Sequence, residues 1–391
     1  MSFFIKIKRE QFGTPQAIAV LLLLALVGQC AWFISMVPLT EVEAAYVGGG
    51  LDYLSHSAVS FDTIRSPLTS LMAAVPLRVV YPQVFSNTSN QFYLDAHRWI
   101  IRFPFVICGL LLGASLWYVA RRLYGNTGGY IALGLYAFNP AVVSHISFAN
   151  PDVITAWGTF GAIFTAIAVA HTLYAPREVI LWNWRRILLL GFCVYLMVGG
   201  LFSAAVLLVL GLAFMLWAVP ERRGAALAIF FAGIVVGFMF LTAAYLFRLP
   251  QYWHGLMRAD WFHASAQAMV TPFVYRVAGF FYLHQAPAAT LLGALALLVY
   301  VVWPRTRFFG NTAPLLVLIA ALLLGFVMPG VVGYGFYFVA LTFIMLFSAG
   351  VLTDVLEHPK LGLALGVVMG VLLTQAVIGL MSLAEMSRSA R

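Results

Sequence analysis

Residues 41–76 read EVEAAYVGGGLDYLSHSAVSFDTIRSPLTSLMAAVP and directly follow the first long apolar run of the chain. The stretch brings together carboxylates, three consecutive glycines, an arginine and two prolines. Irregular polar backbone of this kind does not lie exposed to lipid within the hydrocarbon of a membrane. We therefore expect residues 41–76 to form a loop at a membrane surface, where polar side chains can meet a substrate.

The composition outside this loop is that of an integral membrane protein. Apolar residues make up 63% of the chain and charged residues 9%, and the mean hydropathy is +0.96. A soluble domain would have about 25% charged residues. A helix crosses the membrane with about 20 apolar residues. Runs that fit lie at 16–37, 103–120, 128–148, 153–174, 201–219, 225–247, 286–303, 313–330, 334–352 and 362–383, with a shorter run at 187–199.

These runs predict an all-α bundle of about ten or eleven transmembrane helices. We expect residues 1–391 to form one polytopic membrane domain, with no soluble C-terminal domain. Lys6, Lys8 and Arg9 precede the first run, which by the positive-inside rule places the N-terminus in the cytoplasm. Residues 38–102 and 248–285 then form two long extracytoplasmic loops. Within the first loop, residues 44–56 and 67–80 have the apolar spacing of short interfacial helices.

The net charge of +9 has two readings. A nucleic-acid-binding protein would gather its cations on a soluble face, whereas the arginine pairs here lie at the ends of the apolar runs. Such cations favour anionic phospholipid headgroups. We therefore expect membrane phospholipids, and no nucleic acid, as partners.

Several motifs resemble those of the C-type membrane glycosyltransferases, in the branch of the protein O-mannosyltransferases and aminoarabinose transferases. That family opens with Asp-Glu-x-x-(Tyr/His), a glycine-rich helix and a (Lys/His)-Pro-Pro-Leu turn. The resemblance covers roughly residues 16–220. The matching segments are Thr40-Glu41-Val42-Glu43-Ala44-Ala45-Tyr46, Gly48-Gly49-Gly50, Arg65-Ser66-Pro67-Leu68, residues 98–104, Ala120-Arg121-Arg122-Leu123-Tyr124-Gly125, Phe138-Asn139-Pro140 and Asn150-Pro151-Asp152.

The resemblance implies transfer of a sugar from a polyprenyl-phosphate donor to an extracytoplasmic acceptor, in a multi-pass protein of the bacterial inner membrane. Such a reaction uses a carboxylate base and a cation that offsets the charge of the phosphate leaving group. Glu43 or Glu41 is the expected base, and Asp152 matches the second acidic position of the family. Arg65 and Arg102 are the expected phosphate-binding residues, since guanidinium groups bind phosphate well.

Each of these residues also has a structural interpretation. Glu41 and Glu43 could be solvated charges at a helix N-terminus. Asp152 follows a proline turn and could cap the next helix. His145 lies within an apolar run, where a lone histidine is more often a hydrogen-bonded core residue than a ligand. No metal-binding motif is present, and a divalent cation is left open as a cofactor.

A second function fits the same chain. The family's catalytic Asp aligns with Val42, and Gly200, Gln285 and Phe336 stand where the family carries charged residues. This pattern indicates a catalytically inactive homologue that serves as a structural or lipid-binding subunit among other membrane subunits. The glycines Gly362, Gly366 and Gly370 on the last run are the candidate partner surface.

Overall fold

The computed structural model describes residues 13–55, 67–82, 91–174, 184–248, 287–327, 330–357 and 361–389, together with the single residues 250, 253 and 257. All regular structure in these ranges is helical. The helices are α2 (Thr14–Met36), α3 (Glu41–Leu54), α4 (Pro67–Val80), α5 (Gln91–Ala96), α6 (Arg98–Ala137), α7 (Pro140–Ser147), α8 (Asp152–Thr172), α10 (Trp184–Gly200), η2 (Phe202–Leu207), α11 (Leu208–Ala218), α12 (Arg223–Ala244), α16 (Pro287–Val302), η5 (Pro304–Thr306), α17 (Phe309–Val327), α18 (Gly330–Leu356) and α19 (Leu361–Ser389).

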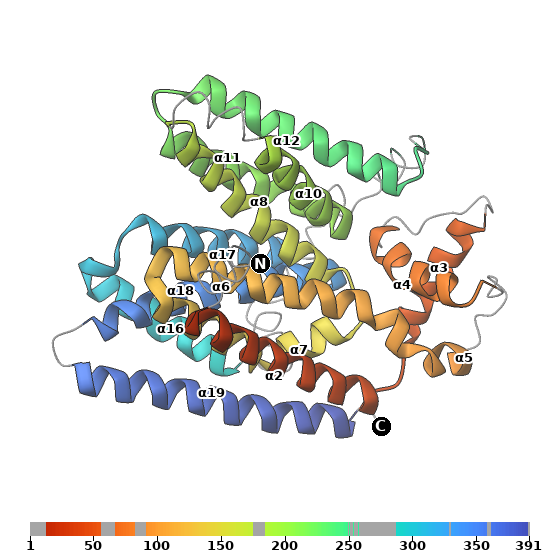
Figure 1. The fold of residues 1–391 in the computed structure, drawn as a ribbon, viewed down its shortest axis with the longest axis horizontal. Helices are drawn as coiled ribbons and strands as arrows, with labels where there is room; N and C mark the ends of the chain where they lie inside the picture. Colours follow the sequence, from red (N-terminus) through yellow and green to blue (C-terminus); the bar gives the residue numbers. More distant parts are fainter. Residues whose placement is uncertain are drawn as a thin grey trace, which may run out of the picture.

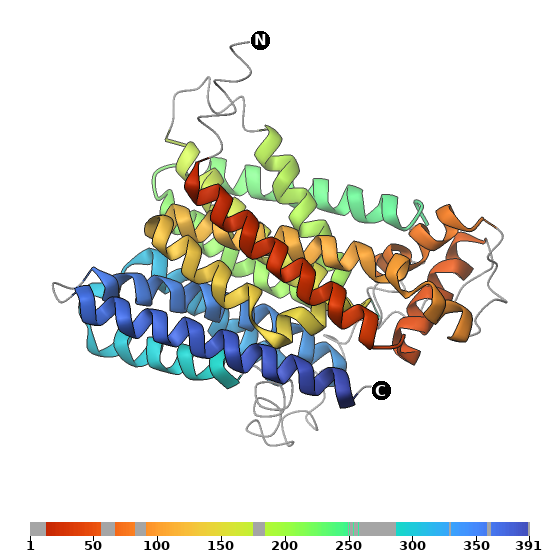
Figure 2. The ribbon, with the colours of Figure 1, turned by 60° about the horizontal axis from the view of Figure 1, so that its bottom comes forward.

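The long helices lie side by side along one direction, and α3, α4 and α5 gather at one end of them (Figure 1). Figure 2 shows the same bundle turned, with α2 and α19 along its outside. The short helix α4 covers Pro67–Val80, the bounds expected from the sequence. The helix expected at 44–56 begins earlier, at Glu41, and ends at Leu54.

Seven helices in the described part of the chain are long and apolar enough to cross a membrane. Three shorter apolar helices, Leu68–Val80, Phe202–Ala218 and Ala288–Val302, accompany them. The predicted run at 103–120 lies in the first part of α6, before the non-helical residue Gly125. The predicted run at 128–148 covers the second part of α6 and continues into α7. The chain is thus a multi-pass, all-α membrane protein, as the composition predicts.

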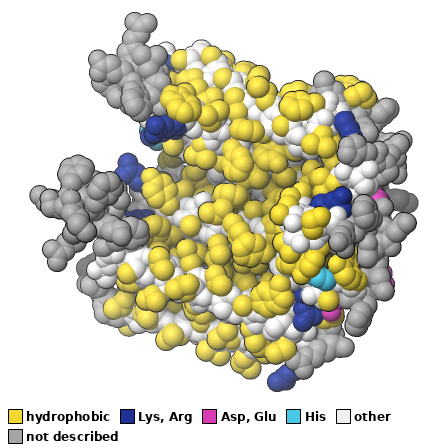
Figure 3. Space-filling view, turned by 45° about the vertical axis from the view of Figure 1, so that its right-hand side comes forward, with side chains coloured by type: hydrophobic (Ala, Val, Ile, Leu, Met, Phe, Trp, Pro, Cys, Tyr) yellow, Lys and Arg dark blue, Asp and Glu magenta, His cyan; other side chains and the backbone are white. Residues whose placement is uncertain are grey.

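Burial orders the helices from the centre outward. In α18, 94% of the apolar window is buried, compared with 28% in α2 and α12 and 22% in α19. Helix α18 therefore forms the core, while α2, α12 and α19 turn apolar side chains outward. The space-filling view shows a surface covered mainly by hydrophobic side chains (Figure 3). Such a surface suits lipid rather than water.

Small residues allow the helices around the centre to approach closely. A Cβ atom on Gly158 of α8 would collide with the backbone of Met197 in α10. A Cβ atom on Gly109 of α6 would meet Ile146 of α7 at 2.5 Å. Close backbone approach is the usual basis of helix association in lipid. These contacts fix α7 and α8, which carry the polar residues described next.

Candidate functional site

The first carboxylates of the chain lie at the start of α3. Thr40 is the N-cap residue, and its Oγ1 accepts a hydrogen bond from the Glu43 backbone N–H at 3.2 Å. In return, Glu43 Oε2 accepts a hydrogen bond from the Thr40 backbone N–H at 2.9 Å. This reciprocal pair is a capping box, which satisfies two backbone donors at once. Because α3 is helical here, Glu41 is exposed and Glu43 is buried.

Glu43 pairs with Arg102 of α6 inside the protein. Arg102 Nε donates to Glu43 Oε1 at 2.8 Å, and Nη2 donates to Oε2 at 2.7 Å. Nη1 also donates to the carbonyl oxygen of Val37, and Nη2 to that of Pro38, both at 2.8 Å. The Arg102 side chain is 0% exposed and that of Glu43 is 3% exposed. Both charges are therefore paired with each other and hydrogen-bonded to the backbone, as burial requires.

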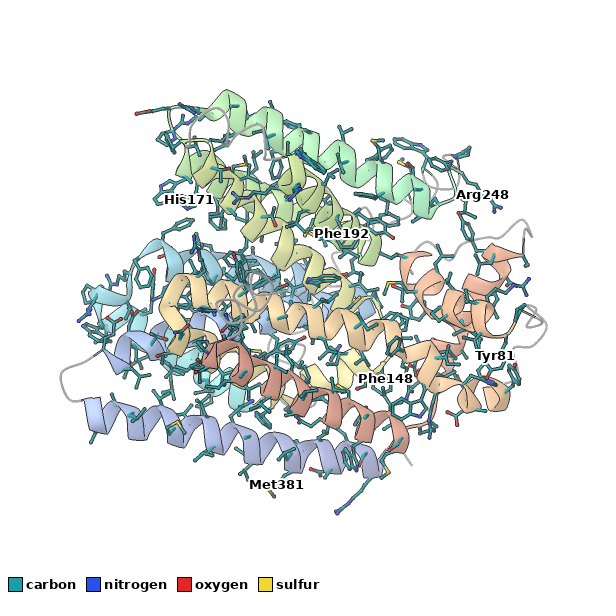
Figure 4. The ribbon with its side chains drawn as sticks, viewed as in Figure 1. Tyr81, Phe148, His171, Phe192, Arg248 and Met381 are labelled. Carbon is teal, nitrogen blue, oxygen red and sulfur yellow. The ribbon has the colours of Figure 1, made fainter. Side chains whose placement is uncertain are left out.

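The pair also holds the segment that leads into α8. Glu43 Oε1 accepts a hydrogen bond from the Ala149 backbone N–H at 2.9 Å. The Arg102 guanidinium lies over the ring of Phe148, 5.1 Å from its centroid. Figure 4 places Phe148 beside α6 and α7, toward the end of the bundle that bears α3 and α4. The Glu43–Arg102 pair thus connects α3, α6 and the α7–α8 turn.

Asp152 is the first residue of α8. The N-cap position belongs to Pro151, and the Asp152 side chain makes no capping hydrogen bond to this helix. The interpretation of Asp152 as a capping residue alone is therefore wrong. Its Oδ2 lies 2.8 Å from Nδ1 of His145 in α7, and the two side chains are only 10% and 12% exposed. Sequence reasoning treated His145 as a lone histidine because the two residues meet across a turn.

The surroundings of Asp152 are closely packed and mainly neutral. Asn150 Oδ1 accepts from the Asp152 backbone N–H at 3.1 Å, and its Nδ2 donates to the His145 carbonyl at 3.2 Å. A Cβ atom on Gly335 of α18 would lie 3.0 Å from Asp152 Oδ1. One on Gly200 would lie 2.9 Å from the Thr155 backbone nitrogen. Glycine at both positions leaves room for the start of α8.

A second contact joins α3 to the end of α12. The Arg248 guanidinium lies 5.0 Å from the centroid of the Tyr53 ring. Leu246 and Phe247 have positive φ angles of 50° and 59°, which turn the chain after α12 (Arg248 is labelled in Figure 4). Burial raises the pKa of the Tyr53 phenol, and the charge of Arg248 opposes this shift.

The structure brings some of the predicted site residues together. Glu43 and Arg102 bind each other, and Asp152 lies three residues beyond Ala149, which Glu43 holds. Glu41 is on the exposed side of α3. Arg65 lies outside the described residues. Within the described ranges, no group of three or more His, Cys, Asp or Glu residues could hold a metal ion.

Two of three comparisons with known proteins gave matches. The sequence profile of the family described as dolichyl-phosphate-mannose-protein mannosyltransferase matches residues 91–247, which is less than half of the chain. The search of curated proteins gave no match. Solved structures that are similar in fold include the Archaeoglobus fulgidus oligosaccharyltransferase AglB and ArnT from Cupriavidus metallidurans.

AglB in complex with an inhibitory peptide and a dolichol-phosphate matches with a TM-score of 0.61 at 13% identity, covering 93% of this chain and 55% of that one. The Archaeoglobus enzyme in complex with Zn and sulfate gives a TM-score of 0.56 at 13% identity, covering 91% and 52%. ArnT bound to undecaprenyl phosphate gives 0.54 at 14% identity, covering 88% and 62%.

These matches confirm the fold expected from the sequence, which is that of the C-type membrane glycosyltransferases. The chain spans little more than half the length of the solved structures it matches. The fold and the profile match therefore describe the architecture of the chain.

Proposed function

We propose that this protein transfers a sugar from a polyprenyl-phosphate donor to an acceptor on the extracytoplasmic side of the membrane. Asp152 serves as the general base that removes the proton of the acceptor. The acceptor oxygen bonds to the anomeric carbon, the bond from that carbon to the phosphate oxygen breaks, and polyprenyl phosphate leaves with the electron pair. The proton passes to Asp152 and then to solvent.

The position of Asp152 is the observation that carries this proposal. It is a buried carboxylate at the first position of the membrane helix α8, three residues beyond Ala149, whose backbone N–H binds Glu43 of α3. A carboxylate in such a place is costly and is by default a functional candidate. No arginine or lysine side chain binds it in the described structure, whereas Glu43 is neutralised by Arg102. A base must be able to accept a proton, and Asp152 meets that requirement better.

The other predicted residues receive different roles in this proposal. Glu43 and Arg102 shape the site, because their hydrogen-bonding groups already bind each other and the backbone. Glu41 is exposed and remains a second candidate base. Arg65 remains the candidate for the donor phosphate. A divalent cation would need ligands besides His145 and Asp152, so we assign it no step.

A subunit without catalytic activity is the second candidate. It is favoured by Gly200 and Phe336, two positions where the family carries charge. Phe336 is completely buried, and Gly200 packs against Thr155 and the Pro151 carbonyl. Neither place has room for a cation that reaches a phosphate. In this alternative the protein would copurify with other membrane subunits and show no turnover.

Donor turnover by the purified protein tests the two candidates. The protein would be reconstituted in nanodiscs with a panel of undecaprenyl-phosphate hexoses and pentoses, a membrane extract of the host would be added as the source of acceptors, and released undecaprenyl phosphate would be measured. We expect release that is lost in Asp152→Asn. Asp354→Asn is the matched control, since Asp354 lies near the opposite end of α18 from Gly335, about 28 Å away along the helix axis. Release equal in wild type and Asp152→Asn would refute the proposal.

The orientation of the bundle belongs to the same proposal, with α3 facing outward and the N-terminus in the cytoplasm. Glu41 and Arg122 are both exposed, Glu41 at the start of α3 and Arg122 three residues before the non-helical Gly125 of α6. Cysteines introduced at these two positions would be labelled with a membrane-impermeant maleimide in spheroplasts, because the native Cys30, Cys108 and Cys193 are buried. Labelling of Glu41→Cys alone is expected, and labelling of Arg122→Cys alone would reverse the topology.

A further inference from the structure

His145 is placed so that only one of its nitrogens meets Asp152. Nδ1 lies 2.8 Å from Oδ2 of the carboxylate. An ionised carboxylate can only accept hydrogen bonds, so Nδ1 carries the proton in this contact. The two residues come from different helices, α7 and α8, which a short turn separates.

The imidazole is held on more than one side. Its ring stacks on Phe338 of α18, with centroids 4.8 Å apart and planes inclined by 21°. Asn150 donates to the His145 carbonyl and accepts from the Asp152 N–H. His145, Asn150 and Asp152 thus form a closed ring of hydrogen bonds across the α7–α8 turn. The imidazole has little freedom to move away from the carboxylate.

The Glu43–Arg102 pair supports the same turn from the other side. Glu43 fixes the Ala149 N–H and Arg102 covers Phe148. Because Arg102 is neutralised by Glu43, it stabilises the turn without competing for Asp152. Among the described residues, the carboxylate therefore has one polar side-chain partner, His145, at Oδ2, while Oδ1 lies on the side of Gly335.

We propose that His145 is a positioning residue for Asp152: it holds Oδ2 by the Nδ1–H hydrogen bond, so that Oδ1 is the atom that removes the acceptor proton. This inference rests on the function proposed above and assigns a role to a residue outside the predicted site. A general base acts only when it is held within hydrogen-bond reach of the proton it takes. A core histidine with a purely structural role would also stabilise the turn, so the test must separate orientation from stability.

Two substitutions make this separation. In His145→Asn the amide nitrogen lies the same number of bonds from Cα as Nδ1, and it can still donate to Oδ2. In His145→Leu the donor is lost at similar volume. We expect His145→Leu to lower kcat about 10- to 100-fold. This is the scale of the loss in activity when the hydrogen-bond partner of a metal-binding residue is removed from a metalloenzyme. The donor KM should stay within about twofold, and His145→Asn should recover most of kcat.

The direct contact can be observed without turnover. In protein labelled with ¹⁵N-histidine, His145→Asn identifies the His145 resonances by their loss. Asp152→Asn should then shift the Nδ1 resonance, and Asp354→Asn should leave it unchanged. An Nδ1 signal that is the same in Asp152→Asn and wild type would show that the contact does not exist, and would overturn the inference.

The kinetic outcomes separate this inference from the proposed function. An inactive Asp152→Asn beside a His145→Leu with wild-type kcat would overturn the role of His145 and leave the function standing. The same holds if His145→Asn is as slow as His145→Leu, because restoring the donor should restore the orientation. Wild-type protein without turnover on any donor would overturn both proposals.

Discussion

Arg102 of α6 and Glu43 of α3 form a two-point ion pair, with Nε–Oε1 and Nη2–Oε2 distances of 2.8 and 2.7 Å. The same carboxylate accepts from the backbone N–H groups of Thr40 and Ala149. One buried charge pair thus fixes the start of α3 and the turn before α8. The pair therefore stabilises the end of the bundle where we propose that the reaction takes place.

Breaking this pair should strongly destabilise the protein. Glu43→Gln leaves the Arg102 charge buried without its counter-charge, which costs about 3 to 5 kcal/mol. Arg102→Met likewise leaves the Glu43 carboxylate buried without its counter-charge. Thermal unfolding in detergent, followed by circular dichroism, would report each change. We expect both variants to unfold at clearly lower temperature than the wild type.

The exposed pair Arg305–Glu357 provides the control. Its N–O distance is also 2.8 Å, but its side chains are 54% and 58% exposed. Such pairs contribute about 0 to 1 kcal/mol, so Glu357→Gln should change the unfolding temperature little. Equal effects of Glu43→Gln and Glu357→Gln would contradict the buried arrangement.

A methyl group at Gly335 should disturb the carboxylate of Asp152. The added Cβ would lie 3.0 Å from Asp152 Oδ1 and 2.6 Å from Leu201 Cδ1. The flexible end of Leu201 can move away, whereas the contact with Oδ1 requires the carboxylate to shift by a few tenths of an ångström. A shift of about 1 Å in a reacting group can lower a rate about 100-fold, so under the proposed function Gly335→Ala should lower kcat by up to about 10-fold in the donor-release assay.

Gly366 of α19 is the matched control for this change. It is also helical, but an added Cβ would meet nothing within 4 Å. Gly366→Ala should leave turnover unchanged and can stabilise the helix slightly, because alanine has the better helix propensity. If Gly335→Ala kept full activity, Oδ1 could not be the atom that meets the acceptor.

Much of the architecture could be predicted from the sequence because lipid imposes simple rules. Apolar runs of sufficient length predicted the helices, and the spacing around Pro67 predicted α4 at its correct bounds. The motifs from Glu41 to Asp152 predicted the fold class. The sequence also contains the capping box from Thr40 to Glu43, which is the signal that could have placed Glu43 in a helix rather than in a loop.

The partners of the site residues could not be predicted in the same way. Glu43 and Arg102 are 59 residues apart in the chain, so no local spacing brings them together. His145 and Asp152 are only seven residues apart, but they meet because the chain turns at Asn150 and Pro151 between two helices. A continuous helix would have set that pair two turns apart. Tertiary contacts, rather than local pattern, decide these roles.

Alkaline pH should weaken the junction between α3 and the end of α12. Burial raises the pKa of Tyr53, and Arg248 partly opposes this. The folded state then holds the phenolic proton at pH values where the unfolded chain, with a tyrosine pKa of about 10, has lost it. The stability due to Tyr53 is complete below about pH 10 and falls as the pH rises through the raised pKa.

Tyr53→Phe isolates this effect, since it keeps a ring beneath Arg248 and removes the titrating group. The unfolding temperature would be compared at about pH 8 and pH 10.5 in both proteins, so that the other tyrosines cancel in the difference. We expect the wild type to lose more stability between these pH values than Tyr53→Phe. Equal losses would show that the Tyr53 phenol is not buried in the folded protein.

The turn inside α6 should require glycine at position 125. Gly125 has φ 77° and ψ −174°, a backbone region that is almost confined to glycine and costs other residues about 1 to 3 kcal/mol. No atom lies within 4 Å of an added Cβ, so Gly125→Ala tests backbone strain without a collision.

Gly134 lies in the same helix at ordinary helical geometry, and its added Cβ would reach only Leu372 at 4.0 Å. We expect thermal unfolding to show a loss of stability for Gly125→Ala and none for Gly134→Ala, because alanine is favoured in a regular helix. If the two variants behaved alike, α6 would have to pass through position 125 as a continuous helix.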